Sequence, residues 1–128
     1  MKFKTIGPVP PGDVIQAEYA NGRVGGHGDY GAVFLNGKRL PLKPSQKVAN
    51  HSPDGFAWGY AGSGPTQLAL ALLLAKRVPP QMTNTLKGRF RDQFIAPLPN
   101  QQSFLIRVDI TKWVDEQIAL AGREGRIV

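Results

Sequence analysis

Five basic residues within one short span are the clearest sign of chemistry in this sequence. They are Lys76, Arg77, Lys87, Arg89 and Arg91, opposed only by Asp92. If residues 81–95 form a helix, Lys87 and Arg91 share one face, because residues four apart are neighbours on a helix. Two adjacent cations can bridge the phosphates of a nucleic-acid backbone. The competing interpretation is a solvated outer face of an amphipathic helix, which needs no ligand.

The turn inside this span argues against sequence-specific contacts to the bases of a nucleic acid. Residues 78–80 are Val-Pro-Pro, whereas the short turn of a DNA-reading helix-turn-helix usually carries glycine. We therefore expect contacts to the backbone of a nucleic acid and not to its bases.

A second basic group surrounds a predicted hairpin and consists of Lys38, Arg39, Lys43 and Lys47. The chain has 128 residues, with 16 Lys and Arg against 9 Asp and Glu, a formal net charge of +7 and a pI near 10.1. Such a balance favours acidic partners: nucleic acid, a nucleoprotein complex or an acidic host protein. A generic basic surface without a specific partner is the alternative.

A candidate anion site lies where a glycine-rich turn opens a predicted helix. It comprises Gly62, Ser63 and Gly64. Free N–H groups and the helix dipole attract anions at such a point. However, Thr66 and Gln67 stand where a Walker motif would have its lysine, and the dinucleotide-binding spacing is also absent. We favour a structural role, in which the glycines let Trp58 and Tyr60 pack against the helix.

No group of residues points to catalysis or to metal binding. The chain has no cysteine, which excludes disulfides and zinc–thiolate sites and fits a reducing cytoplasm. His27 and His51 have no helical partner for a zinc site, and Ser63 lacks the spacing of a catalytic serine. The nine carboxylates are scattered along the chain. We expect no catalytic residue, no metal and no cofactor.

The predicted centre of the fold is the apolar stretch at residues 56–75. Pro65 suits the first turn of a helix, and apolar residues then cover every helical face as far as Ala75. This helix should be buried on nearly all sides, and it is too short to cross a bilayer. Before it, Phe56, Trp58 and Tyr60 alternate with small residues, which is typical of a strand.

The remaining segments predict strands first and then further helices. Asn36-Gly37 between two apolar runs predicts a type I′ hairpin, and residues 14–19 and 103–109 have the composition of strands. Residues 45–55 indicate a short strand or a loop that ends in a turn. Apolar residues at steps of four predict a second helix over residues 81–95: Met82, Leu86, Phe90 and Phe94. A third helix over residues 110–121 should bury Ile110, Trp113, Val114, Ile118 and Ala121.

These elements predict a single α+β domain over residues 1–128, a small mostly antiparallel sheet packed on one face by about three helices. Residues 1–13 should form an extended proline-rich arm, residues 14–123 the globular part and residues 124–128 a frayed tail. The segment between Gly22 and Gly31 should be a glycine-rich loop. We see no secretory signal and no membrane span, and we expect a cytoplasmic protein.

A resemblance to a known family adds context to this interpretation. Residues 52–73 read SPDGFAWGYAGSGPTQLALALL. They resemble the S-P-x-G-F-x-W-G-Y-x-G-S-G-P-x-Q-L-A-L-A-L-L signature of a small domain family of unknown function, found largely in bacteria and on plasmids, phages and integrated elements. The resemblance extends to Phe90, Phe94, Trp113 and residues 95–99, and covers roughly residues 32–121. It implies an accessory factor of a mobile element, of the kind that binds nucleic acid or disarms a host defence complex.

Together these observations predict a non-enzymatic basic binding protein that contacts nucleic acid or a nucleoprotein complex. One alternative is an inhibitor of a host defence complex, similar to anti-CRISPR proteins, which would bind a protein through the loop at residues 22–31 and exposed aromatic rings. Another is a phosphate or nucleotide ligand at the glycine-rich turn.

Overall fold

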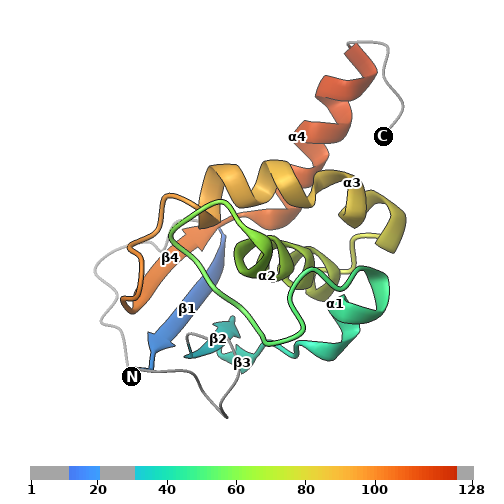
Figure 1. Cartoon of the computed structure of the whole chain (residues 1–128). Helices are drawn as coiled ribbons and strands as arrows, with labels where there is room; N and C mark the ends of the chain where they lie inside the picture. Colours follow the sequence, from blue (N-terminus) through green and yellow to red (C-terminus); the bar gives the residue numbers. More distant parts are fainter. Residues whose placement is uncertain (1–11, 21–30, 124–128) are drawn as a thin grey trace, which may run out of the picture.

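The structure, a computed structural model, describes residues 12–20 and 31–123 of the chain (Figure 1). These residues form a single α+β domain with a four-stranded antiparallel sheet, as the sequence predicted. In chain order its elements are β1 (Asp13–Tyr19), β2 (Gly31–Leu35), β3 (Lys38–Arg39), α1 (Lys43–Val48), α2 (Ser63–Ala75), α3 (Pro80–Phe90), the π-helical turn η2 (Arg91–Ile95), β4 (Phe104–Val108) and α4 (Ile110–Arg123).

The sheet has the strand order β3-β2-β1-β4, with each strand antiparallel to its neighbours. Ile15 of β1 lies opposite Leu35 of β2 and Ile106 of β4, so apolar side chains from three strands meet on one face. The predicted hairpin joins β2 to β3. Asn36 and Gly37 both have positive φ, at 52° and 84°, as a type I′ turn requires.

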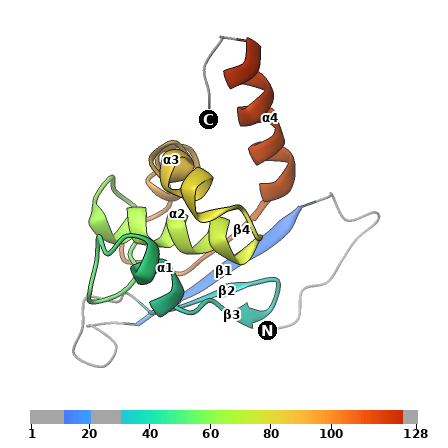
Figure 2. The same cartoon turned by 90° about the vertical axis from the view of Figure 1, so that its right-hand side faces the viewer.

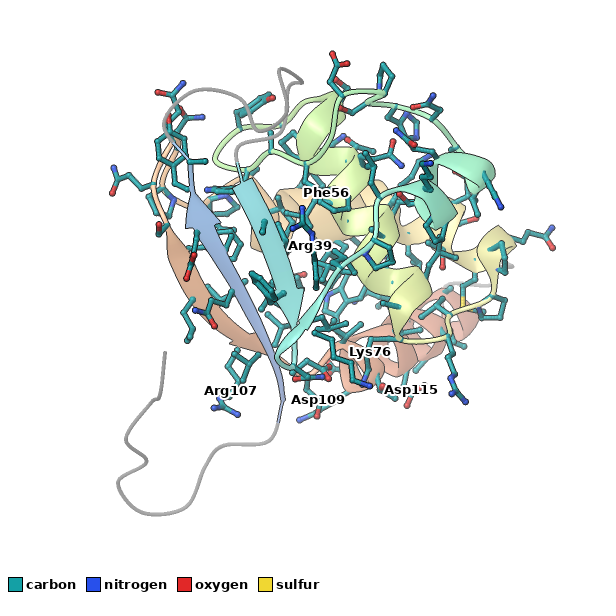
Figure 3. All side chains as sticks on the ribbon, turned by 90° about the horizontal axis from the view of Figure 1, so that it is seen from below. Arg39, Phe56, Lys76, Arg107, Asp109 and Asp115 are labelled. Carbon is teal, nitrogen blue, oxygen red and sulfur yellow. The ribbon has the colours of Figure 1, made fainter. Side chains whose placement is uncertain are left out.

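Helix α2 is the core of the molecule, because its residues from Gly64 to Leu73 are all buried. Figure 3 shows the strands on one side and the helices on the other, so the sheet is covered on one face. The buried amide of Gln67 is fully paired. Its Oε1 accepts from the backbone N–H groups of His51 and Ser52, and its Nε2 donates to Ser45 Oγ at 2.8 Å.

The predicted apolar stripe of the second helix packs as expected. Phe90 is fully buried, its ring centroid lies 4.9 Å from that of Phe94, and both rings meet Trp113 of α4 at 5.2 and 5.9 Å. Helix α4 then runs away from the other elements in both views (Figures 1 and 2). The prediction of a buried Ile118 is therefore wrong: this residue is 40% exposed on the projecting part of α4.

Two local predictions are wrong for identifiable reasons. Residues 56–60 are not a strand, because Phe56, Ala57 and Trp58 are all buried instead of alternating, and Gly59 turns the chain at φ 89°. Residues 45–48, the start of the predicted strand or loop, belong instead to the short helix α1, whereas residues 49–55 form a loop that ends in a turn, as predicted. Pro44 stands in its first turn, where a missing N–H has no cost.

The second helix also differs in detail, since the α-helical part ends at Phe90 and continues as η2, in which the Ala96 N–H donates to the Arg91 carbonyl. The predicted proline-rich arm, glycine-rich loop and frayed tail lie outside the described residues, apart from Gly12, Asp13 and Gly31. Within the described residues, no helix is both long and apolar enough to cross a bilayer.

Candidate functional site

The basic residues of α3 and η2 point in two directions. Lys87 and Arg91 lie four residues apart on one face, as predicted. Arg89 lies on the opposite face, where its Nη1 donates to Gln117 Oε1 of α4 at 2.7 Å. The structure therefore keeps two of the three predicted cations together and separates the third.

Lys87 and Arg91 lie beside His51, a residue of the loop between α1 and α2. The Lys87 Nζ is 2.5 Å from His51 Nε2 and also donates to Asn84 Oδ1. Burial lowers the pKa of Lys87. Burial also lowers the pKa of His51, and the positive charges of Lys87 and Arg91 lower it further. Both effects favour the neutral imidazole, and in the tautomer with its proton on Nδ1 the His51 Nε2 accepts a hydrogen bond from the Lys87 ammonium.

Arg91 connects this face to the start of α2. Its Nη1 donates to Thr66 Oγ1 at 3.0 Å, and its Nε donates to Asp92 Oδ1 at 2.7 Å. Thr66 belongs to the first turn of α2, next to the candidate anion site at Gly62, Ser63 and Gly64. Two separate groups of sequence-predicted residues thus meet at one end of this helix.

The glycines of that turn have a structural explanation of their own. A Cβ on Gly62 would lie 2.5 Å from the Tyr60 ring, and a Cβ on Gly64 would lie 2.6 Å from the Ala57 Cβ. These contacts leave no room for side chains. Packing alone therefore accounts for glycine at both positions, and the anion site there stays a prediction.

Lys76 and Arg77 lie at the opposite end of α2. The Lys76 Nζ forms an ion pair with Asp13 Oδ1 at 2.8 Å. In Figure 3, Lys76 lies at the same end of the molecule as Asp109 and Asp115, so its surroundings are acidic. Arg77 follows in the left-handed region, at φ 63°, and is exposed. The structure does not bring these two residues to Lys87 and Arg91.

The hairpin group lies along the edge of the sheet and on α1. Lys38 and Arg39 form β3, Lys43 begins α1, and all three side chains are exposed. A pocket of about 380 Å³ lies between this hairpin and the end of α2, and its lining includes Lys38, Arg39 and Lys76. Figure 3 shows Arg39 well apart from Lys76.

The described residues contain no group of three or more His, Asp or Glu that could hold a metal ion. Of the two histidines, His51 is engaged with Lys87, and His27 lies outside the described residues. Sequence reasoning considered His51 only as a metal ligand, and so missed its place beside the two cations Lys87 and Arg91. Its contact with Lys87 spans 36 residues, and no local spacing encodes it.

A family model of unknown function, DUF6166, matches residues 23–116. The chain belongs to the DUF6166 family. No curated protein and no solved structure matches the chain. The DUF6166 match begins at residue 23, earlier than the resemblance suggested, and ends inside α4 at residue 116. It includes every residue of the His51, Lys87 and Arg91 group.

Charge is distributed unevenly along residues 31–123. Residues 31–91 contain nine Lys and Arg and one carboxylate, Asp54, whereas residues 92–123 contain three basic and four acidic residues. Within the described part of the chain, only Lys76 and Arg91 of those nine form ion pairs. The basic charge is therefore concentrated on the elements from β2 to η2.

Proposed function

We propose that this DUF6166 protein is a non-enzymatic binding protein for the phosphate backbone of nucleic acid. The observation that carries the proposal is the segregation of charge: nine basic residues and one carboxylate between residues 31 and 91. A field of one sign attracts a polyanion and raises its rate of association. The accessory role in a mobile element that the resemblance implies is part of the same proposal.

The arrangement of these elements supports contact over an extended surface. Helix α1 follows β3 directly, and the loop after α1 reaches α3 at the contact of His51 with Lys87. Basic side chains thus follow one another from the sheet edge over α1 to α3. Most of them are exposed and lack a carboxylate partner within the described residues. Side chains of this kind suit phosphates and carry no base information.

The test is a fluorescence-anisotropy titration of labelled single- and double-stranded nucleic acid over a series of salt concentrations. The double variant K43E/K47E reverses two exposed charges on α1, and K112E is a control with an exposed lysine on α4. We expect the plot of log affinity against log salt to become less steep by about 2 in K43E/K47E. K112E should leave this slope nearly unchanged.

Two outcomes would reject the proposal. The first is an absence of binding at about 50 mM salt, where backbone contacts are strongest. The alternative, a protein target engaged through residues 22–31, would then take its place. The second is an equal loss of binding in K112E, because only net charge, and no particular surface, would then matter.

A further inference from the structure

Three basic side chains from three segments converge on one point beside the first turn of α2. They are His51 from the loop after α1, Lys87 from α3 and Arg91 from η2. The loop is fixed in place, because the His51 N–H donates to Gln67 Oε1 at 2.7 Å. Arg91 is fixed by its bond to Thr66. The convergence is therefore built by the packing of α1, α2 and α3.

The charge of Lys87 is not neutralised within the described structure. Its two acceptors, the His51 ring and the Asn84 amide, carry no charge. Asp92 accepts from Arg91 Nε, and Thr66 accepts from Arg91 Nη1, so no hydrogen bond among the described residues engages Arg91 Nη2. Partly buried like charges repel one another and lose hydration, so an arrangement of this kind is most stable when an anion joins it.

The surface beside Arg91 is also kept open. Gly88 lies in the middle of α3, where glycine weakens a helix relative to alanine. A Cβ at this position would meet only Arg91 Nη2, at 4.0 Å, so packing does not require glycine here. Because Gly88 has no side chain, Arg91 Nη2 is open on the side that faces Gly88.

We infer that His51, Lys87 and Arg91 bind a phosphate group. Lys87 supplies a compact charge, and Arg91 supplies the N–H groups of Nη2. When the Lys87 ammonium donates to a phosphate, it no longer donates to His51 Nε2. The His51 ring then faces an anion, takes a proton from solvent and becomes a third donor to the phosphate. The proposed function supplies the source of this phosphate, a nucleic-acid backbone, but the site itself does not depend on it.

The experiment uses the NMR titration of the His51 ring. In the variant H27Q, His51 is the sole histidine, so one imidazole signal reports its protonation. The pKa of His51 is measured with inorganic phosphate and with sodium chloride at equal ionic strength. We expect inorganic phosphate to raise this pKa in a saturable way, because the phosphate favours the protonated ring.

Two charge variants in the H27Q background locate the effect. K87Q removes the positive charge of Lys87 from the proposed site. R89Q removes one charge from the opposite face of the same helix. The phosphate-dependent rise in the pKa of His51 should vanish in K87Q and persist in R89Q. An equal rise with chloride, or an unchanged rise in K87Q, would overturn the inference.

A short single-stranded oligonucleotide, added in a second series, separates this inference from the proposed function. An equal response to the oligonucleotide would support nucleic acid as the source of the phosphate. A response to inorganic phosphate alone would support the site and reject nucleic acid as its source. Equal oligonucleotide affinity in K87Q and its parent, with no response of His51, would reject the site and retain the proposed function.

Discussion

A half-buried lysine lies near each end of α2, Lys76 directly after the helix and Lys87 of α3 beside its first turn, but the partners of the two lysines differ. At the carboxyl end, Lys76 pairs with the carboxylate of Asp13. Near the amino end, the partners of Lys87 among the described residues are the His51 imidazole and the Asn84 amide, and no carboxylate pairs with it. The charge of Lys76 is therefore paired within the fold, whereas Lys87 has hydrogen-bond acceptors but no opposite charge. A basic residue is therefore a candidate for ligand binding when its partners leave its charge unpaired.

Asp13, the partner of Lys76, is fully engaged in hydrogen bonds. It accepts from Lys76 Nζ, from Asn36 Nδ2 and from the buried Ile110 N–H, and so connects β1 to the hairpin, α2 and α4. Burial alone would raise the pKa of Asp13, but these three hydrogen bonds outweigh burial and hold the pKa below 3.8. Stability from this network is present above pH 3.8 and is lost as the pH falls below it.

The largest expected effect comes from the substitution Asp13→Asn. An amide cannot accept all three hydrogen bonds and leaves a buried donor unpaired. The free energy of unfolding should therefore fall by about 3 kcal/mol at pH 7. Urea denaturation measures this change. The control Glu18→Gln removes an exposed charge from the same strand and should change stability by less than about 0.5 kcal/mol. Similar results for the two variants would contradict a structural role for Asp13.

The fold was largely predictable, because its strongest signals are local. The hairpin follows from two adjacent residues that tolerate positive φ, Asn36 and Gly37. The burial of α2 follows from its apolar residues on all faces. The segment from Phe56 to Trp58 was misjudged, because buried coil and strand share apolar composition and differ in tertiary contacts, such as the bond from Trp58 Nε1 to the Gln102 carbonyl.

The candidate site was predictable only in part. Helical spacing placed Lys87 and Arg91 together, as the structure has them. The same reasoning grouped Lys76 with them, since Asp13, its partner, is 63 residues away in the sequence. His51 was overlooked for the same physical reason. Which cations are neutralised depends on long-range pairing, and the composition of a segment does not encode it.

The next effect tests how the amino end of α2 is held, which we attribute to packing and not to ion pairs. In Gly64→Ala the new Cβ would lie 2.6 Å from the Ala57 Cβ and 3.2 Å from the Ala57 N. Overpacking against backbone should destabilise the protein by about 2 kcal/mol. Gly88→Ala is a matched control in α3, without a close contact, and should stabilise by up to about 1 kcal/mol. Thermal unfolding distinguishes the two signs.

A smaller effect is expected when a carboxylate is placed beside Lys87, as Asp13 lies beside Lys76. Asn84→Asp keeps the shape of the side chain that accepts from Lys87 and adds a negative charge. Because Asn84 is exposed and Lys87 is only half-buried, stability should change by less than about 0.5 kcal/mol. Phosphate should bind about threefold more weakly, the value of one exposed ion pair. The measurement is the His51 titration with inorganic phosphate, and unchanged affinity would show that the charge of Lys87 is not what binds.

The smallest expected effect is a dependence of the free energy of unfolding on pH near neutrality. It comes from His51, near the amino end of α2. Because the pKa of His51 lies below 6.5 in the folded protein, the unfolded chain binds more protons as the pH falls below about 6.5. Stability is therefore full above that pH and declines below it. Urea denaturation between about pH 7.5 and 5.5, in the H27Q background, should show this decline.

His51→Gln, in the same background, decides which end of α2 causes the decline. Glutamine can still accept from Lys87 but does not titrate, so the decline should become shallower. Asp13 contributes nothing in this range, since its pKa lies below 3.8. Inorganic phosphate should also flatten the decline in the H27Q protein, because a bound anion favours protonated His51 in the folded state. A decline that is the same with glutamine and with histidine would mean that the folded protein does not lower the pKa of His51, by burial or by the two cations, and the two ends of α2 would then not differ in the way their contacts indicate.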